Sequence, residues 1–154
     1  MRTRCFLAAV VLFGVASAMA LAQTPNPLVG KWTLNAAKSK GPATAGMTIV
    51  EAVGDGIKMT VELVGADGKK MNWAFTANYD GKDVPVSGDS PYGDTSSLKR
   101  VDARTTQINS KYQGKPTTVH TIVVSADGKT RTSTVKGTDK TGKPLDAMSF
   151  YEKQ

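Results

Sequence analysis

The chain has 154 residues, of which 20 are basic and 13 are acidic, so its formal net charge is +7. The lysines are spread over predicted turns and are not interleaved with aromatic residues, as a stacking surface for nucleic-acid bases would require. This distribution argues against nucleic acid as a partner. The single histidine and single cysteine exclude a metal site built from several such ligands, and we predict no metal and no cofactor.

Residues 1–22 have the pattern of a signal peptide. Arg2 and Arg4 form a basic start, residues 6–15 form an apolar segment, and small residues end in A-L-A at positions 20–22. The apolar segment is short for a membrane span, which needs about 20 residues. We therefore predict cleavage after Ala22, a periplasmic or secreted mature protein, and no membrane span after cleavage.

Cleavage would also remove Cys5, the only cysteine, and with it any disulfide or thiolate nucleophile. The net charge would fall by two, from +7 to +5, an excess that a solvated surface explains. Residues 23–154 lack a linker or a shift in composition, and their number suits one domain. We predict a single domain over 23–154 and favour a monomer.

Turn signals recur along the mature chain at a nearly even pace, many of them Asp-Gly pairs of the kind that form tight hairpins. Between them, apolar and polar residues alternate, as in Ile57, Met59, Val61 and Leu63, which is the period of a half-buried strand. Threonine is abundant in these segments and favours strands. We predict nine or ten strands, at Trp32–Leu34, Thr48–Val53, Ile57–Leu63, Met71–Tyr79, Val84–Val86, Ser96–Val101, Thr105–Tyr112, Thr117–Ser125, Thr130–Thr138 and Leu145–Tyr151.

The best helical segment, Asn35–Lys40, is too short to be stable alone, and the connections leave no room for helical crossovers. Short strands joined by successive hairpins favour an all-β fold, an antiparallel up-and-down β-barrel of about 8–10 strands. The irregular segment Ser87–Asp94 is interpreted as a loop at the barrel mouth or a mid-chain crossing.

Gly30-Lys31-Trp32 at the first strand, followed by the meander, resembles the calycins: the lipocalins, the fatty-acid-binding proteins and small exported bacterial proteins described as lipocalin-like. The resemblance implies a barrel closed at one end, with Gly30 and Trp32 at its floor. In lipocalins a late arginine covers this tryptophan; the last predicted strand has none, and Lys153 is the candidate substitute. The R-x-Y carboxylate grip of fatty-acid-binding proteins is missing, because Met148-Ser149-Phe150-Tyr151 stands there.

Candidates for chemistry are few, and we predict that the protein is not an enzyme. His120 has no accompanying nucleophile or carboxylate motif, so a structural or surface role is the simpler interpretation. Most aspartates occupy turn positions, where they hydrogen-bond the backbone. Asp89 and Asp94 offer oxygen ligands for calcium, but their spacing matches no EF-hand loop.

The remaining group of candidate residues consists of apolar and aromatic side chains that could line the interior of a barrel. Binding pockets are mostly apolar with a few placed polar groups, whereas a filled core is the alternative for small barrels. We predict a small apolar or amphipathic ligand inside the barrel. The alternative is a protein-interaction or envelope module with a filled core, such as a protease-inhibitor-like barrel. The candidate ligand-binding residues are Met59, Trp73, Phe75, Tyr79 and Tyr112, with Phe150 and Tyr151 as further lining candidates.

Overall fold

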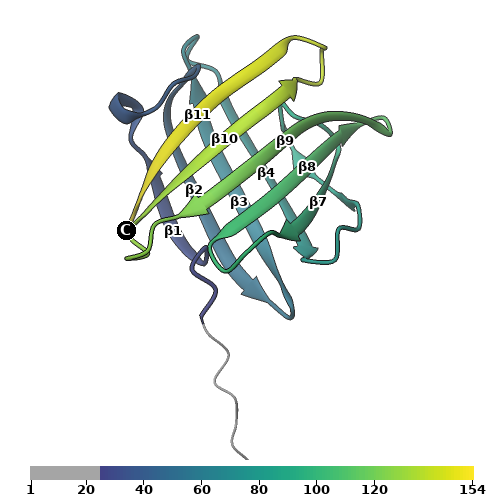
Figure 1. The fold of residues 1–154 in the computed structure, drawn as a ribbon. Helices are drawn as coiled ribbons and strands as arrows, with labels where there is room; N and C mark the ends of the chain where they lie inside the picture. The colour runs from purple at the N-terminus through teal and green to yellow at the C-terminus, as the bar shows by residue number, and fades with distance from the viewer. Residues whose placement is uncertain (1–24) are drawn as a thin grey trace, which may run out of the picture.

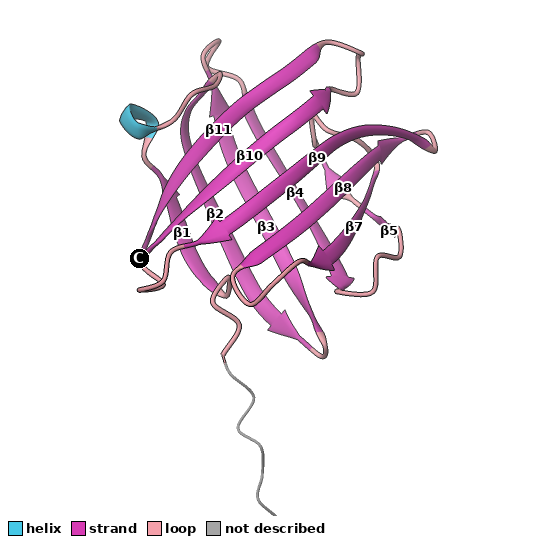
Figure 2. Ribbon diagram, viewed as in Figure 1, coloured by secondary structure: helices cyan, strands magenta, loops and turns pink. Residues whose placement is uncertain are grey.

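The structure, a computed structural model, describes residues 25–154. The predicted signal at residues 1–22 lies outside the described residues. No helix within residues 25–154 has the length and apolar character needed to cross a membrane. The one helical element among the described residues is a single 3-10 turn, η1 (Ala36–Lys38), which begins where the side chain of Asn35 accepts a hydrogen bond from the Lys38 backbone (Figure 2).

The described chain forms one antiparallel sheet that curls into a nearly closed barrel (Figure 1). This confirms the prediction of an all-β, up-and-down barrel. The sheet has eleven strands, more than the nine or ten predicted, because Ser87–Gly88 forms a short strand inside the segment interpreted as irregular. The strands are β1 (Gly30–Leu34), β2 (Ala43–Val53), β3 (Gly56–Gly65), β4 (Lys70–Asn78), β5 (Val84–Pro85), β6 (Ser87–Gly88), β7 (Thr95–Arg100), β8 (Thr105–Tyr112), β9 (Lys115–Val124), β10 (Thr130–Thr138) and β11 (Pro144–Lys153).

The strand order is β5-β7-β8-β9-β10-β11-β1-β2-β3-β4-β6, so the first long strand pairs with both the second and the last. Hairpins join most neighbours in this order, as the turn signals indicated. The two ends of the sheet meet at a seam between β4 and β7, where the two-residue strands β6 and β5 are added. An isolated bridge between Asp80 and Lys99, together with a 3.0 Å hydrogen bond from the Gly81 amide to the Leu98 carbonyl, joins the seam at one point.

Alternation along the strands places the core inside the barrel. On β3, Ile57, Met59, Val61 and Leu63 are buried, while Lys58 and Glu62 are exposed. In register on β4, Phe75 pairs with Met59 and Trp73 pairs with Val61, and both aromatic residues are buried. The period of two read from the sequence therefore gives the correct inner face for these two strands.

One end of the barrel is closed around Trp32, whose side chain is fully buried. Its indole Nε1 donates a hydrogen bond of 2.9 Å to the Leu28 carbonyl, and Leu28 is buried beside it. Gly30 has a φ of +140°, which a side chain would strain, and an added Cβ would meet the Lys153 side chain. Gly30 and Trp32 thus lie together at this end of the barrel.

Candidate functional site

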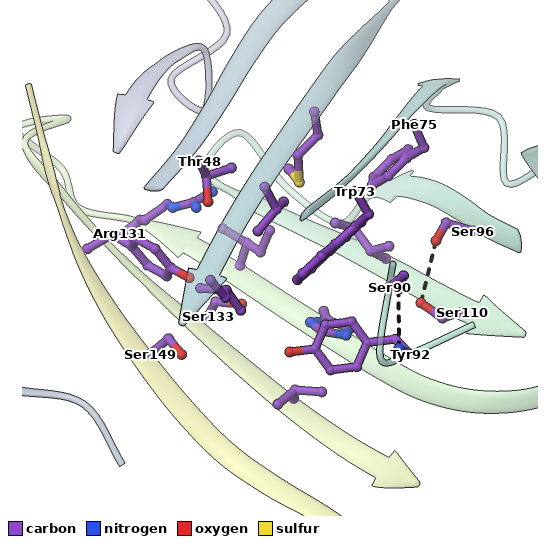
Figure 3. Close-up of a pocket in the computed structure, with 18 residues that line it drawn as sticks. Thr48, Trp73, Phe75, Ser90, Tyr92, Ser96, Ser110, Arg131, Ser133 and Ser149 are labelled. Atoms are coloured by element: carbon purple, nitrogen blue, oxygen red, sulfur yellow. Dashed lines mark hydrogen bonds between the residues drawn. The ribbon is translucent and has the colours of Figure 1, made fainter. Parts of the chain in front are cut away.

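The interior of the barrel is not completely filled. A cavity of about 70 Å³, here called the inner chamber, lies between the two sides of the barrel. One water needs roughly 10–15 Å³ of such space, so the chamber has room for several waters or a small organic group. It is lined by Thr48, Met59, Val61, Leu63, Trp73, Phe75, Ser90, Tyr92, Ser96, Ile108, Ser110, His120, Ile122, Arg131, Ser133, Val135, Ser149 and Tyr151 (Figure 3).

One wall of the inner chamber is apolar. It is built from β3 and β4, whose register brings the Met59–Phe75 and Val61–Trp73 pairs side by side. Each of these side chains is less than a tenth exposed. Burial holds the wall in place, because each large apolar side chain contributes about 1.5–3 kcal/mol when it leaves water. An apolar group in the chamber would therefore meet a preformed surface.

The other walls carry small hydroxyl side chains where a filled core would have large aliphatic ones. Ser96 of β7 and Ser110 of β8 are cross-strand partners, and their hydroxyls lie 3.5 Å apart. Ser133 of β10 pairs with Ser149 of β11, and both line the chamber. These short side chains leave the space that makes the chamber, and their hydroxyls can donate or accept hydrogen bonds.

At the closed end of the inner chamber lies Arg131 of β10, which is only 3% exposed. Its guanidinium carbon is 5.2 Å from the centre of the Trp32 ring and 4.4 Å from that of Tyr151. Removal from water lowers the pKa of Arg131 from its ordinary value to about 10, so the group is still charged at neutral pH. Its Nε and Nη1 atoms are buried and have no hydrogen-bond partner. Figure 3 shows the side chain directed from the strand into the barrel.

This arginine adds a second cation to the one expected over the Trp32 ring. The sequence reasoning found no arginine in the last strand and put Lys153 in its place. Lys153 does lie over the Trp32 ring, with Nζ at 5.1 Å from its centre, but Arg131 of the preceding strand packs against the same ring. The available signal was the alternation on β10, where Arg131 shares a face with Ser133 and buried Val135.

Toward the other end of the chamber lies His120 of β9, which is cross-strand from Val135. Val135 lies four positions along β10 from Arg131, which corresponds to roughly 13 Å along the strand. The His120 Nε2 atom is 3.1 Å from the Thr118 hydroxyl, and burial lowers the pKa of His120 from 6.5 to about 4. The imidazole is therefore uncharged at neutral pH.

Tyr92 stands between His120 and the apolar wall. Its ring packs edge-on against His120, with centroids 4.4 Å apart, and against Trp73 at 5.6 Å. Burial raises the pKa of Tyr92 above its ordinary value. The residue belongs to the segment Ser87–Asp94, which crosses the barrel mouth, as one of the two interpretations of the sequence had it.

Beyond Tyr92 a second cavity, here called the outer chamber, opens at the mouth and has a volume of about 370 Å³. It shares Leu63, Tyr92, Val135 and Ser149 with the inner chamber. Its remaining lining residues are Ser39, Gly41, Pro42, Ala43, Gly65, Ala66, Asp67, Met71, Pro91, Asp139, Lys143, Leu145 and Ala147. The two chambers are thus neighbours along the barrel axis with Tyr92 at their boundary.

The crossing segment is tied to both sides of the mouth. Asp89 forms ion pairs with Lys140 at 2.9 Å and with Lys69 at 3.3 Å, and hydrogen bonds from these lysines lower the pKa of its carboxyl group. The Lys140 amide donates to the Pro91 carbonyl at 2.9 Å, and the Thr117 hydroxyl donates to the Tyr92 carbonyl. Tyr92 is therefore positioned by contacts on each side of it.

The structure brings three of the five predicted site residues together. Met59, Trp73 and Phe75 all line the inner chamber, and so does Tyr151. Tyr79 and Tyr112 are not among the lining residues. Tyr79 packs near the closed end, where its hydroxyl accepts a 2.8 Å hydrogen bond from Asn26. Tyr112 is half-buried at the last position of β8, beyond a register shift.

Phe150 also lies outside the inner chamber. Its ring is covered by Lys38, whose Nζ is 5.0 Å from the centre.

The sequence reasoning missed the serines, Tyr92 and Arg131 as lining residues of the inner chamber. Serine carries little pattern information, and Tyr92 lies in the segment that was interpreted as irregular.

The polar side chains that line the inner chamber are mainly hydroxyl groups, together with His120 and Arg131. No aspartate or glutamate lines the inner chamber in the described part of the chain, so His120 has no carboxylate there to orient it as a base. Within residues 25–154, no group of three or more histidine, cysteine or acidic residues could hold a metal ion. The two aspartates that were considered as calcium ligands have partners within the protein. Asp94 accepts a hydrogen bond from the Gln113 amide, and Asp89 is paired with Lys69 and Lys140.

No family model matches this chain, and no curated protein matches it.

Proposed function

We propose that the protein is an exported, lipocalin-like barrel that binds a small amphipathic molecule in its inner chamber. One observation carries the proposal: the barrel interior contains a chamber in which an apolar wall faces a set of hydroxyl groups. This mixture is typical of small-molecule sites, where apolar contact supplies affinity and a few polar groups fix orientation.

The contrast with a filled barrel supports this proposal over an interaction module. Barrels of about eight strands are often just filled by side chains. Here the inward positions of β7, β8, β10 and β11 include Ser96, Ser110, Ser133 and Ser149, and each serine leaves space that a leucine would occupy. A module acting only through its outer surface has no need of such a chamber.

Binding can be measured through Trp73, which lies in the apolar wall. We expect a saturable change in tryptophan fluorescence when the mature protein is titrated with short-chain fatty acids, small aromatic acids and alcohols, retinoids and aromatic dyes. The variant Trp73→Phe removes the reporter while keeping an aromatic wall, so it should keep binding in calorimetry and lose most of the fluorescence change.

A matched pair of variants on β10 locates the site. Ser133→Leu places a larger side chain in the inner chamber and should weaken binding at least about tenfold, since overfilling a packed interior costs about 1–3 kcal/mol. Thr132→Leu changes the adjacent, outward position and should leave affinity unchanged. Binding that ignores Ser133→Leu would place the ligand elsewhere. No saturable binding by any probe would favour the interaction module.

Export is the second part of the proposal and has its own test. When the full chain is expressed with its leader in a bacterial host, the mature protein should begin at Gln23, because Ala20 and Ala22 are the small residues that a signal peptidase reads. Intact-mass measurement of the exported protein checks this. A mature protein that retains Cys5 would contradict it.

A further inference from the structure

Arg131 is a buried positive charge, and no acidic side chain among the described residues lines the chamber with it. A buried charge is costly unless it is paired and hydrogen-bonded, and buried arginines are usually both. The rings of Trp32 and Tyr151 offset part of the cost by cation–π attraction. They do not accept the hydrogen bonds of Nε and Nη1, which are buried without partners, and no acidic residue lines the chamber within the described range.

We propose that the ligand is a small monocarboxylic acid whose carboxylate pairs with the guanidinium of Arg131, which lines the inner chamber. This inference rests on the proposed function and names its ligand class. A carboxylate supplies what the chamber lacks, a single negative charge and acceptor oxygens on a planar group. The guanidinium presents parallel N–H donors that match a carboxylate in a bidentate geometry.

The rest of the chamber limits the ligand to one charge. Toward the mouth, the walls offer Trp73, Phe75 and the uncharged His120, so a second acidic group would be buried without a cation to pair with it. A phosphate monoester, with up to two charges, is disfavoured for the same reason. The apolar body of the acid would lie along the β3–β4 wall and extend toward Tyr92 and the outer chamber.

The first test compares acids with neutral molecules of the same shape in the unaltered mature protein. Calorimetric titration with benzoate, phenylacetate and hexanoate should give binding at least about tenfold tighter than benzyl alcohol, phenylethanol and hexanol, since a charge-assisted hydrogen bond contributes about 1.5–3 kcal/mol. Phenyl phosphate should bind more weakly than benzoate.

The second test asks whether Arg131 is the source of the preference. Arg131→Met should abolish the acid-over-alcohol preference, measured as the ratio of the two affinities in the same variant. Arg131→Lys keeps the charge without the planar fork and should give an intermediate preference. Arg100→Met is the matched control, because Arg100 stacks on Tyr79 at 4.2 Å outside the inner chamber, and it should change nothing.

The outcomes separate this inference from the proposed function. Equal affinity for acids and alcohols, or tighter binding of phenyl phosphate, would overturn the monocarboxylate assignment and leave a binding barrel. An acid preference that survives Arg131→Met would also overturn it. Failure of every probe to bind would overturn the proposed function itself. Should Arg131→Met not fold, the acid–alcohol comparison in the unaltered protein still decides.

Discussion

Replacing Trp32 with alanine is expected to lower the free energy of unfolding by about 3–5 kcal/mol, the range for large aromatic residues removed from cores. Trp32 is fully buried at the closed end and donates a hydrogen bond to Leu28. The substitution would leave a cavity and deprive the Leu28 carbonyl of its donor. It would also remove one of the two rings that stack on Arg131, so the cost of that buried charge should rise.

Urea denaturation monitored by circular dichroism measures this effect. The matched control is Lys153→Met, which removes the other cation lying over the Trp32 ring but keeps the ring and most of the aliphatic packing. It should change stability by less than about 1 kcal/mol, as is usual for exposed charges. A Trp32→Ala protein that melts within a few degrees of the unaltered protein would contradict the role of Trp32 as the closing residue of the barrel.

The second large expected effect is a loss of stability on mild acidification, caused by His120. In the unfolded chain the imidazole takes up a proton near pH 6.5, whereas burial lowers its folded pKa to about 4. Between these two pH values the unfolded state binds more protons than the folded state, so the free energy of unfolding rises with pH. The contribution of His120 to this free energy reaches its full value above about pH 6.5. A pKa difference of one corresponds to about 1.36 kcal/mol, which gives a loss of about 2–3 kcal/mol between pH 6.5 and 4.5.

Two other groups that line the chamber have shifted pKa values: that of Tyr92 is raised and that of Arg131 is about 10, so neither group changes charge in this window. Several surface carboxyls, such as Asp102 and Asp127, have lowered pKa values because the backbone or a serine hydrogen-bonds them. Their contribution is lost only at lower pH, below their unfolded values near 4.

Denaturation midpoints measured at several pH values between 4.5 and 7 test this expectation. The variant His120→Gln keeps a polar side chain but cannot take up a proton, so its stability should be nearly flat over the window. If the unaltered protein and His120→Gln depend on pH in the same way, the buried, uncharged His120 is not the cause.

Strands with clear alternation and clear turns were predictable from the sequence. β8 and β10 have the predicted bounds, Thr105–Tyr112 and Thr130–Thr138, because turn residues flank each of them. β2 begins at Ala43, five residues before the prediction, since its first residues are small and carry little hydrophobic pattern. β6 was missed because two residues that pair only at the seam have no local signal.

The inner chamber was predictable only in part. The inward direction of Met59, Trp73 and Phe75 follows from the strong alternation of apolar and polar residues on β3 and β4. Arg131 stands among threonines and serine on a strand whose apolar marker is Val135, and the parity that it shares with Val135 is a weak signal for its inward direction. Its contact with Trp32 depends on how β10 pairs with its neighbours, which single-strand patterns do not contain.

The seam of the barrel has a consequence for how molecules of this protein meet one another in concentrated solution. Sheet edges can template pairing with another chain and so seed aggregation, and short strands or proline at an edge suppress this. Here β4 and β7 would be the edges, and each is capped by a two-residue strand. Pro85 in β5 has no amide hydrogen to offer a neighbour. Lengthening β5 and β6 into regular, proline-free strands would extend the hydrogen-bond ladder and favour edge-to-edge association. The shortness of these two strands therefore helps to keep molecules of the protein apart.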